Sequence, residues 1–332
     1  MMMFRAAVIG CGKIGSEFAD DPRGQGVRSH AEAYRACPST RLIALCDTDT
    51  EKLERCGRRW DVRAVYVEPL QLLTEMQPEI VSVCTPDDTH YELIRQCVSS
   101  PHVRAVLAEK PLALTLAHAE ELDRLARERG ILLAVNYSRR YARSFERLRD
   151  FLRTGGIGRI QALGGYYSKG TLHNGTHWFD LARHLVGEVA GVWGVDAMKE
   201  GGRDPTLDAF LEFEGGIGGC LQGCAASAFD IFEMDILGTT GRVRVVESGA
   251  RFEKYTVSEN PRYTGYRALC RVEDLVQGPQ NELLHAVENL VGCLTRGESP
   301  RCSSRDGVAA LEIALAVRES ARSGCPVLLR QS

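Results

Sequence analysis

The sequence lacks the features that mark several specialised classes of protein. No apolar run approaches the roughly 20 residues that a membrane span needs, and no block of like charge suggests a nucleic-acid or membrane surface. The 41 basic and 44 acidic residues are interspersed, and the formal net charge is −3 at pH 7. The opening Met-Met-Met-Phe leads into a strand-like run instead of the apolar core of a signal peptide. We therefore expect a soluble protein of the cytoplasm.

The 12 cysteines lack the spacing of a metal site. No Cys-x-x-Cys pair occurs, so neither a zinc site nor a disulfide framework is indicated. Cys46, Cys84 and Cys97 lie within apolar stretches, which is typical of buried thiols. We expect no structural metal.

The chain is long enough for two domains, since single cores stop growing near 250 to 300 residues. Its first part, residues 1–135, alternates short apolar runs with amphipathic stretches, which predicts the doubly wound parallel sheet of a Rossmann domain. The predicted strands are Ala6–Gly10, Leu42–Asp47, Ile80–Cys84, Ala105–Ala108 and Leu132–Asn136. A helix is predicted over Leu114–Glu128, ending at Gly130.

The pattern changes in residues 136–332, which we assign to a C-terminal α/β domain for substrate binding and oligomerisation. Strands follow one another there without long helices between them, which favours an open, mostly antiparallel sheet. The predicted strands are Gly158–Lys169, Thr206–Phe213, Gly218–Ala228, Phe232–Gly238 and Arg242–Glu247, with a hairpin turn at Gly215-Gly216. Helices Thr176–Val186 and Asn281–Thr295 are expected beside this sheet, and Arg305–Ser323 forms a third.

The first strand runs directly into a glycine motif, Gly10-x-Gly12-x-x-Gly15, with Lys13 and Ile14 inside it. This spacing predicts a dinucleotide site, because the glycines allow a tight turn, close approach of a pyrophosphate, and close packing of the next helix. That helix is expected over Lys13–Ala19. A polar insert, Asp20–Gly26, then precedes a second helical stretch, Ser29–Cys37.

Asp47, at the end of the second predicted strand, favours NAD over NADP. Its carboxylate can accept hydrogen bonds from the adenosine ribose and would repel a 2′-phosphate. The residues that follow it, Thr48-Asp49-Thr50, offer no arginine to bind that phosphate.

Four further motifs occur in a particular order along the chain. They are Thr85-Pro86-x-x-x-His90, Glu109-Lys110-Pro111, Asn136-Tyr-Ser-Arg139-Arg140, and Gly175-Thr176-His177-x-x-Asp180. With the glycine motif and a closing helix that begins at Asp306, they resemble the Gfo/Idh/MocA family over nearly the whole chain. The resemblance implies an NAD(P)-dependent oxidoreductase acting on sugars, inositols or nucleotide-linked sugars.

The resemblance also implies roles for residues near the nicotinamide. Thr85 and Pro86 would pack against that half of the cofactor, with His90 beneath the site and Glu109 beside it. Lys110 would bind the reacting hydroxyl and help to manage its proton. Pro111 restricts the backbone of Lys110 to extended conformations, which would direct the ammonium group into a crevice.

His177 is the candidate acid/base, because the reference pKa of imidazole is about 6.5. Lys110 is then the orienting group, and the reverse assignment stays open. Many members of the family have an aspartate four residues before this histidine, where this chain has His173-Asn174. His177 could act with Lys110 alone, or His173 could substitute as its partner. A metal bound by these imidazoles and Asp180 is disfavoured, because Gly175 should interrupt the helix.

Several polar and aromatic residues could line a carbohydrate site. They are Lys110, Arg140, Tyr141, Tyr166, Tyr167, Lys169, His173, Asn174, His177, Tyr266 and Arg267. A nucleotide sugar or amino sugar is one candidate substrate, and a free polyol or inositol is the other.

Two other functions are compatible with the same fold. One is a glycosidase-like or eliminating enzyme that retains NAD and recycles it. The other is a cofactor-binding sensor whose catalytic set has decayed, as the missing aspartate before His177 would allow. The small and apolar residues of Gly218–Ala228, including Cys220, Leu221, Cys224 and Ala226, predict burial against a second subunit in a homodimer or homotetramer.

Overall fold

The computed structural model describes residues 3–199, 201–276 and 281–330. The chain forms two compact units. The first consists of Met1–Ala142 and Pro279–Leu311, and the second of Arg143–Gly278 and Glu312–Ser332. The chain passes between the units for the third time within helix α9 (Ser304–Ser323). Each unit is described by itself.

The first unit is built on a six-stranded parallel sheet with the order β3-β2-β1-β4-β5-β6. The strands are β1 (Phe4–Ile9), β2 (Thr40–Cys46), β3 (Val65–Tyr66), β4 (Ile80–Val83), β5 (Ala105–Ala108) and β6 (Leu132–Val135). Every residue of β4 and β5 is buried, as expected for parallel strands covered on both faces. The predicted Rossmann sheet is confirmed.

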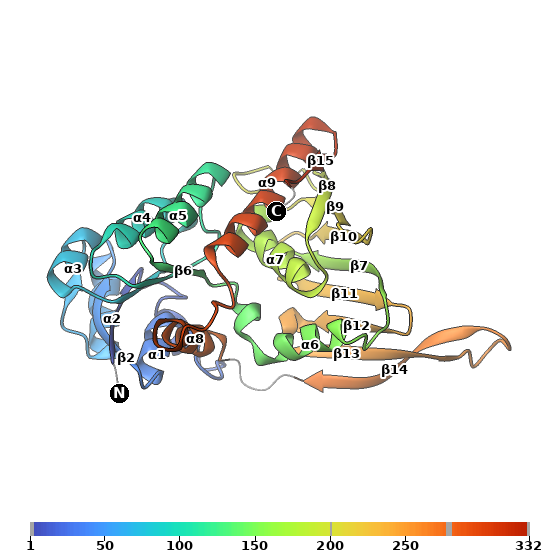
Figure 1. Ribbon diagram of the computed structural model, residues 1–332, viewed down its shortest axis with the longest axis horizontal. Coiled ribbons are helices and arrows are strands. Elements are labelled where there is room, and N and C mark those ends of the chain that lie inside the picture. Colours follow the sequence, from blue (N-terminus) through green and yellow to red (C-terminus); the bar gives the residue numbers. More distant parts are fainter. Residues whose placement is uncertain (1–2, 200, 277–280, 331–332) are drawn as a thin grey trace. The chain divides into compact units, whose positions relative to one another are not determined.

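Six helices of the first unit flank this sheet in Figure 1. They are α1 (His30–Ala36), α2 (Thr50–Trp60), α3 (Pro69–Met76), α4 (His90–Ser99), α5 (Leu116–Glu128) and α8 (Glu282–Arg296). Helix α8 contacts α1, so the stretch Asn281–Thr295 belongs to the first unit. The prediction that it lies beside the second sheet is wrong. The described part of the chain contains no helix long and apolar enough to cross a membrane.

The helix predicted over Lys13–Ala19 does not form. Turns occupy residues 13–16, and a short 3₁₀ helix, η1 (Glu17–Asp20), follows. The carbonyl of Gly12 accepts hydrogen bonds from the amides of both Ser16 (2.9 Å) and Glu17 (3.1 Å). The second of these bonds spans one residue more than an α-helical bond, so the turn over residues 12–17 is wider than an α-helical turn. The polar insert ends the coil at once. The regular helix comes later, as α1, whose first turn is capped by the Ser29 hydroxyl accepting from the Glu32 amide at 3.2 Å.

The second unit contains a nine-stranded sheet with the order β14-β13-β12-β11-β7-β10-β9-β8-β15. Its strands are β7 (Ile160–Tyr167), β8 (Val189–Val195), β9 (Asp208–Phe213), β10 (Gly218–Gly223), β11 (Phe232–Gly238), β12 (Gly241–Val246), β13 (Arg251–Glu259), β14 (Arg267–Val276) and β15 (Val327–Leu328). Only the β10–β7 pair is parallel, which confirms a mostly antiparallel sheet. The hairpin turn at Gly215-Gly216 joins β9 to β10, as predicted.

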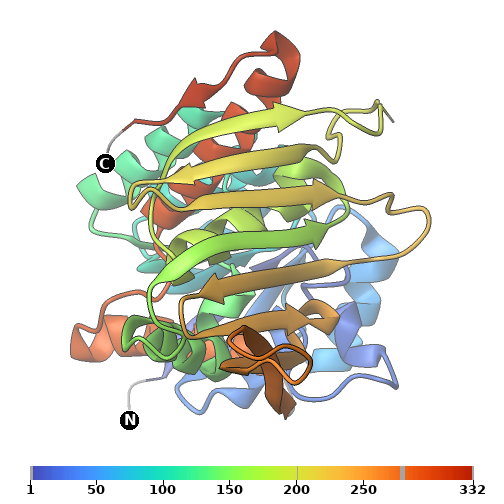
Figure 2. The ribbon, with the colours of Figure 1, turned by 90° about the vertical axis from the view of Figure 1, so that its right-hand side faces the viewer.

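The strand predicted over Gly218–Ala228 is shorter than expected. It ends at Gly223, and the amide of Cys224 makes a last bond to the Tyr167 carbonyl (2.8 Å) before the chain turns. Leu221 is buried on one face of the sheet, whereas Cys220 is exposed on the other. Helices α6 (Arg143–Arg153) and α7 (Thr176–Leu185) lie behind the sheet in Figure 2, where the opposite face is turned to the viewer.

Candidate functional site

The carboxyl ends of five neighbouring strands bring most of the predicted cofactor residues to one edge of the first sheet. Gly10 follows β1, Asp47 follows β2, Thr85 follows β4, and Glu109 follows β5. Asn136 follows β6. Ligands of open α/β sheets bind at this edge, where the strand order reverses.

The glycine loop has the geometry that a pyrophosphate needs. Gly10 adopts φ +99°, and a Cβ there would lie 2.6 Å from the carbonyl carbon of Cys84. A Cβ on Gly15 would lie 1.9 Å from the Gly10 carbonyl oxygen, so any side chain would break the turn. Gly12 faces open space, with no atom within 4 Å of the position of a Cβ. The backbone is therefore accessible at the position where a dinucleotide approaches most closely.

Asp47 is already part of the glycine loop. Its Oδ2 accepts a hydrogen bond from the Cys11 amide at 2.7 Å, and its Oδ1 accepts one from the Asp49 amide at 2.9 Å. The carboxylate is half-buried, and each oxygen retains a lone pair for a further donor. The arrangement fits a ribose diol.

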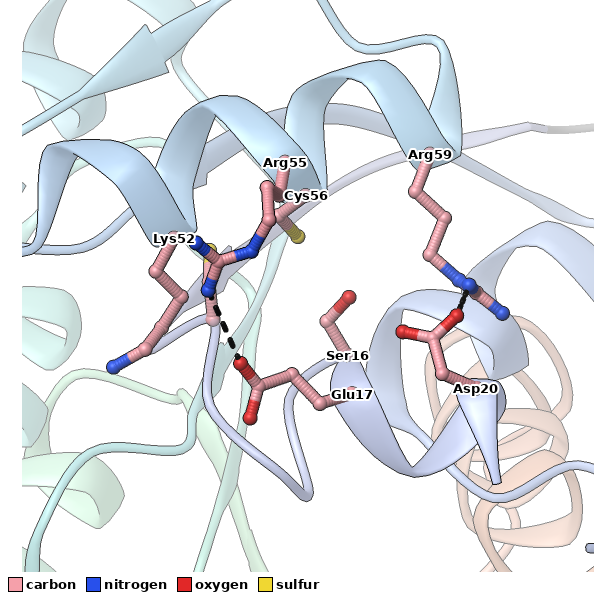
Figure 3. Close-up of a pocket in the computed structure, with 8 residues that line it drawn as sticks. Ser16, Glu17, Asp20, Lys52, Arg55, Cys56 and Arg59 are labelled. Atoms are coloured by element: carbon pink, nitrogen blue, oxygen red, sulfur yellow. Dashed lines mark ion pairs between the residues drawn. The ribbon is translucent and has the colours of Figure 1, made fainter. Parts of the chain in front are cut away.

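A cavity of about 370 Å³ lies between the glycine loop and α2. Its lining consists of Cys11, Ser16, Glu17, Asp20, Lys52, Arg55, Cys56 and Arg59. Figure 3 shows Glu17 and Asp20 reaching toward Arg55 and Arg59 of α2. Glu17 pairs with Arg55 at 3.7 Å, and Asp20 pairs with Arg59. The sequence did not indicate these cations near Asp47, because they lie five or more residues beyond it on a helix.

His90 is buried between two loops of the same edge. Its Nε2 lies 2.8 Å from the Thr85 carbonyl oxygen, and its Nδ1 lies 2.7 Å from that of Pro111. Carbonyl oxygens only accept, so both contacts are hydrogen bonds when both ring nitrogens carry a hydrogen. His90 thus joins the Thr85-Pro86 loop to the segment that carries Lys110.

Glu109 is buried, and two side chains donate to its Oε1. These donors are His30 Nε2 at 3.0 Å and Asn136 Nδ2 at 2.6 Å. Burial raises the pKa of the Glu109 carboxyl, but the hydrogen bond from His30, the charge of Lys110 and the hydrogen bond from Asn136 together hold it below its ordinary value. The group is therefore ionised at neutral pH. His30 continues the chain of bonds through Nδ1 to Ser82 Oγ (2.8 Å) and from there to the Tyr34 hydroxyl (2.8 Å).

The histidines of the second unit lie on a continuous helical segment. A π-helix over Gly170–Gly175 carries His173 and runs directly into α7, which carries His177. Gly175 has helical angles, φ −59° and ψ −36°. The prediction that it interrupts the helix is therefore wrong. His173 is exposed and His177 is half-buried. Single π-helical turns of this kind occur frequently at functional sites.

Asp204 holds the start of this segment. Its two carboxylate oxygens accept hydrogen bonds from the amides of Leu172 and His173, both at 2.8 Å. A Cβ on Gly170 would lie 2.1 Å from Asp204 Oδ2, so glycine is required for the carboxylate to fit. No local sequence pattern indicates this residue, because Asp204 is 31 residues away from His173.

The candidate substrate residues differ widely in accessibility. Tyr141 and Tyr167 are fully buried, and their hydroxyls donate to the carbonyls of Val135 (3.3 Å) and Leu207 (2.8 Å). Arg140 pairs with Asp306 at 3.0 Å, and Lys169 with Asp230 at 2.6 Å. In the remainder of the set, Asn174 donates to the Ser168 carbonyl at 2.8 Å, Lys110 is half-buried, and Tyr166 and Tyr266 are exposed.

Sequence reasoning missed His30, Ser82 and Asp204. A signal for His30 was present, because it begins an otherwise apolar helical face. Cys46, Cys84 and Cys97 are buried as predicted. Among the described residues, no group of three or more histidine, cysteine, aspartate or glutamate side chains could hold a metal ion.

Comparison with known proteins gives matches over most of the chain. Residues 4–137 match the NAD-binding Rossmann fold of an oxidoreductase family, GFO_IDH_MocA, and residues 167–329 match its C-terminal alpha/beta domain. Myo-inositol 2-dehydrogenase of Thermotoga maritima is 23% identical over 342 residues, covering 95% of this chain and 96% of that protein.

Two solved structures share the fold of the whole chain. The WlbA dehydrogenase from Bordetella pertussis, in complex with NADH and UDP-GlcNAcA, has a TM-score of 0.80 at 20% identity, covering 100% of this chain and 99% of that one. Levoglucosan dehydrogenase, in complex with NADH and L-sorbose, has a TM-score of 0.81 at 19% identity, with both chains covered completely.

Proposed function

Because the chain belongs to the Gfo/Idh/MocA family of NAD-binding oxidoreductases, we propose that it is an NAD-dependent dehydrogenase acting on CH–OH groups. It would transfer hydride between nicotinamide and the hydroxyl-bearing carbon of a sugar, nucleotide sugar or polyol. One observation carries the proposal. The glycine loop, Asp47 and the Glu109-Lys110 pair share the carboxyl edge of one parallel sheet.

The bound nicotinamide supplies the hydride acceptor, and the chain supplies the groups around it. Gly10, Gly12, Lys13, Ile14 and Gly15 would hold the pyrophosphate. Thr85, Pro86, His90 and Glu109 would shape the nicotinamide side of the edge.

Lys110 would donate a hydrogen bond to the reacting hydroxyl and orient it. His177 would take the hydroxyl proton as the alcohol is oxidised to a carbonyl, with the hydride leaving to the acceptor that a bound nicotinamide would supply. His173 would assist His177, and a general base of this kind contributes about 10²–10⁴-fold to the rate.

NAD is the proposed cofactor, and NADP is the less favoured alternative. Asp47 would accept from the ribose hydroxyls and repel a 2′-phosphate. The cations beside it are matched by carboxylates of the chain, since Arg55 pairs with Glu17 and Lys52 pairs with Asp49 at 3.6 Å.

The substrate is proposed to be a carbohydrate or cyclitol with adjacent hydroxyls. The related proteins named above act on, or were solved with, myo-inositol, L-sorbose or UDP-GlcNAcA. Asn174, Lys169 and Arg140 are the proposed polar contacts, and Tyr141 and Tyr167, whose rings are buried, are proposed as supporting residues of the substrate site.

A panel of inositols, aldoses, polyols and UDP-sugars tests the function, with NADH absorbance and substrate consumption followed together. We expect NADH to form in equal amount to the oxidised product with NAD⁺, and more slowly with NADP⁺. Substrate consumption without net NADH would point instead to internal recycling of the cofactor. A chain that binds NADH but oxidises nothing in the panel would count against the proposal.

Domain roles and assembly complete the proposal. Residues 1–135 would bind the dinucleotide, and residues 136–332 would bind the substrate and a second subunit. Trp193 and Cys220 pair in register with Phe210 on neighbouring strands. Trp193 is 53% exposed and Phe210 50% exposed, so a row of apolar side chains faces outward.

A homodimer, or a homotetramer built from such dimers, would bury this row. Phe210→Glu should produce monomers in light scattering at micromolar concentration. The next residue, Leu211, is buried on the other face of the sheet and is not substituted. A wild-type protein that is monomeric under these conditions would contradict the assembly proposal.

A further inference from the structure

A chain of buried polar groups ends at Glu109, the residue directly before Lys110. It runs from the Tyr34 hydroxyl to Ser82, then to His30, and then to Glu109, through bonds of 2.8, 2.8 and 3.0 Å. Tyr34, Ser82 and His30 are all 0% exposed. Burying four polar side chains in a row is costly unless every one of them is hydrogen-bonded, so the chain calls for a physical explanation.

The donors and acceptors can be assigned in one consistent direction. Tyr34 donates to Ser82, Ser82 donates to His30 Nδ1, and His30 Nε2–H donates to the Glu109 carboxylate. Each polar hydrogen then has an acceptor among these bonds. If both nitrogens of His30 carried hydrogen, Ser82 would donate to Tyr34, and no bond among these four residues would accept the Tyr34 hydrogen. The neutral Nε2–H tautomer therefore fits best.

The chain of bonds does not lead to solvent. Its far end, the Tyr34 ring, is completely buried. A route for protons to and from water would need an accessible terminus, so these groups fix geometry instead of conducting protons.

The position of Glu109 also restrains the residue after it, Lys110. The Glu109 amide donates to the Val83 carbonyl at 2.9 Å, which continues the β5–β4 ladder by one residue. The Glu109 backbone is thus held against β4 and its side chain is held by His30, and Lys110 follows it directly, at a bend of the chain. The ammonium group is also close enough to lower the pKa of Glu109.

We propose that His30 is a positioning residue, which acts through Glu109 to set the direction and the electrostatic environment of the Lys110 amine. The inference rests on the proposed function for the role of Lys110. The imidazole orients the carboxylate and keeps it ionised, and the carboxylate holds the backbone and the charge next to the reacting hydroxyl.

Two variants of His30 separate its two bonds. In His30→Gln the amide nitrogen can replace Nε2 and still donate to Glu109, whereas in His30→Asn the shorter amide reaches only toward Ser82. Ser82→Ala is the matched control, because it removes the other bond of the imidazole and leaves the Glu109 contact. NADH affinity and thermal unfolding are measured for all three.

With a substrate from the panel, we expect His30→Asn to lower kcat by about tenfold or more with little change in NADH affinity. The acidic limb of its profile of kcat against pH should move to higher pH, because the pKa of Glu109 rises when the carboxylate loses the hydrogen bond from His30. His30→Gln should retain more of the activity, and Ser82→Ala should leave the acid limb in place. Equal losses in all three variants, tracking their melting temperatures, would overturn the proposal.

A readout without substrate keeps the two proposals distinguishable. Acylation of Lys110 by a water-soluble amine reagent, followed by peptide mass spectrometry, should be about threefold faster in His30→Asn, because a weaker carboxylate charge stabilises the ammonium less. Ser82→Ala should match the wild type. If no panel compound is oxidised but Lys110 labelling responds in this way, the proposed function fails and the positioning role stands. If dehydrogenation is found and neither the acid limb nor the labelling rate moves, the positioning role fails alone.

Discussion

Four candidate histidines, two in each unit, lie in contrasting environments. His30 and His90 have no exposed surface, and all four of their ring nitrogens lie within 3.0 Å of a polar atom of the first unit. His173 is exposed and His177 is half-buried, and the segment before them is held by the Asp204 carboxylate through backbone amides. Where an imidazole serves as a fixed connector, its ring is buried and satisfied. Where an imidazole is proposed to exchange protons with a substrate, the backbone is fixed instead and the ring is at least partly exposed.

Of the substitutions that test these roles, removal of the Lys110 amine is expected to lower kcat the most. Lys110→Ala should lower kcat by about 10²–10⁴-fold, because it removes the donor that we propose to orient and polarise the reacting hydroxyl. NADH binding, followed by fluorescence titration, should change by less than about threefold, since uniform cofactor contacts remain. Lys254→Ala, which removes an ammonium 4.8 Å from the Phe151 ring, is the control. Unchanged turnover in Lys110→Ala would reject the proposed role of Lys110.

The next prediction compares His173 with His177, the two candidate histidines of the second unit. His177→Gln should lower kcat by about 10²–10³-fold because the proton acceptor is lost, while His173→Gln should cost about tenfold or less. Steady-state kinetics with both variants across pH 6 to 9 provides the measurement. The larger loss in His173→Gln would reverse the assignment. His173→Asp supplies the carboxylate found in many relatives. A gain of activity from an inactive parent would identify a decayed site.

Sequence patterns predicted the parallel sheet well because its strands are short, apolar and bounded by polar ends. The same reasoning located Gly10, Asp47, Thr85 and Glu109, since strand ends collect at one edge of such a sheet whatever the loops do. The edge itself therefore followed from the sequence.

The failures share a different physical origin. The helix predicted over Lys13–Ala19 is replaced by turns and a short 3₁₀ helix, because the polar insert that follows leaves too few residues for a regular α-helix. Gly175 was expected to break a helix, yet it is helical within a π-turn that Asp204 stabilises from 29 residues beyond it in sequence. His30, Ser82 and Asp204 act through contacts between distant segments, and neither periodicity nor local spacing reports such contacts.

Asp204→Asn tests whether the segment of His173 depends on a carboxylate. Hydrogen bonds to a charged group contribute about 1.5–3 kcal/mol each, and asparagine can keep only one good acceptor. We expect the free energy of unfolding to fall by about 2 kcal/mol and kcat by about tenfold, as measured by chemical denaturation and steady-state kinetics. Asp196→Asn, whose carboxylate accepts from the Lys199 amide at 2.9 Å in the same β8–β9 connection, should change neither quantity appreciably. Activity equal to the wild type in Asp204→Asn would show that the π-helix is held by other contacts.

The smallest expected effect concerns Asp47 and can be divided between two variants. Asp47→Asn removes the negative charge but keeps an oxygen that can accept from the Cys11 amide, whereas Asp47→Ala removes both. The preference for NAD over NADP should fall by about tenfold in both variants, because the repulsion of a 2′-phosphate is gone. Affinity for NAD should fall further in Asp47→Ala, because the glycine loop then loses the bond that is 2.7 Å long in the wild type. Isothermal titration with both dinucleotides measures the two effects, with Asp49→Ser as a control that removes a nearby charge and retains a capping side chain for α2. If the wild type already binds NADP more tightly than NAD, the selectivity lies elsewhere, and Lys52 and Arg55 in the adjacent cavity become the residues to test.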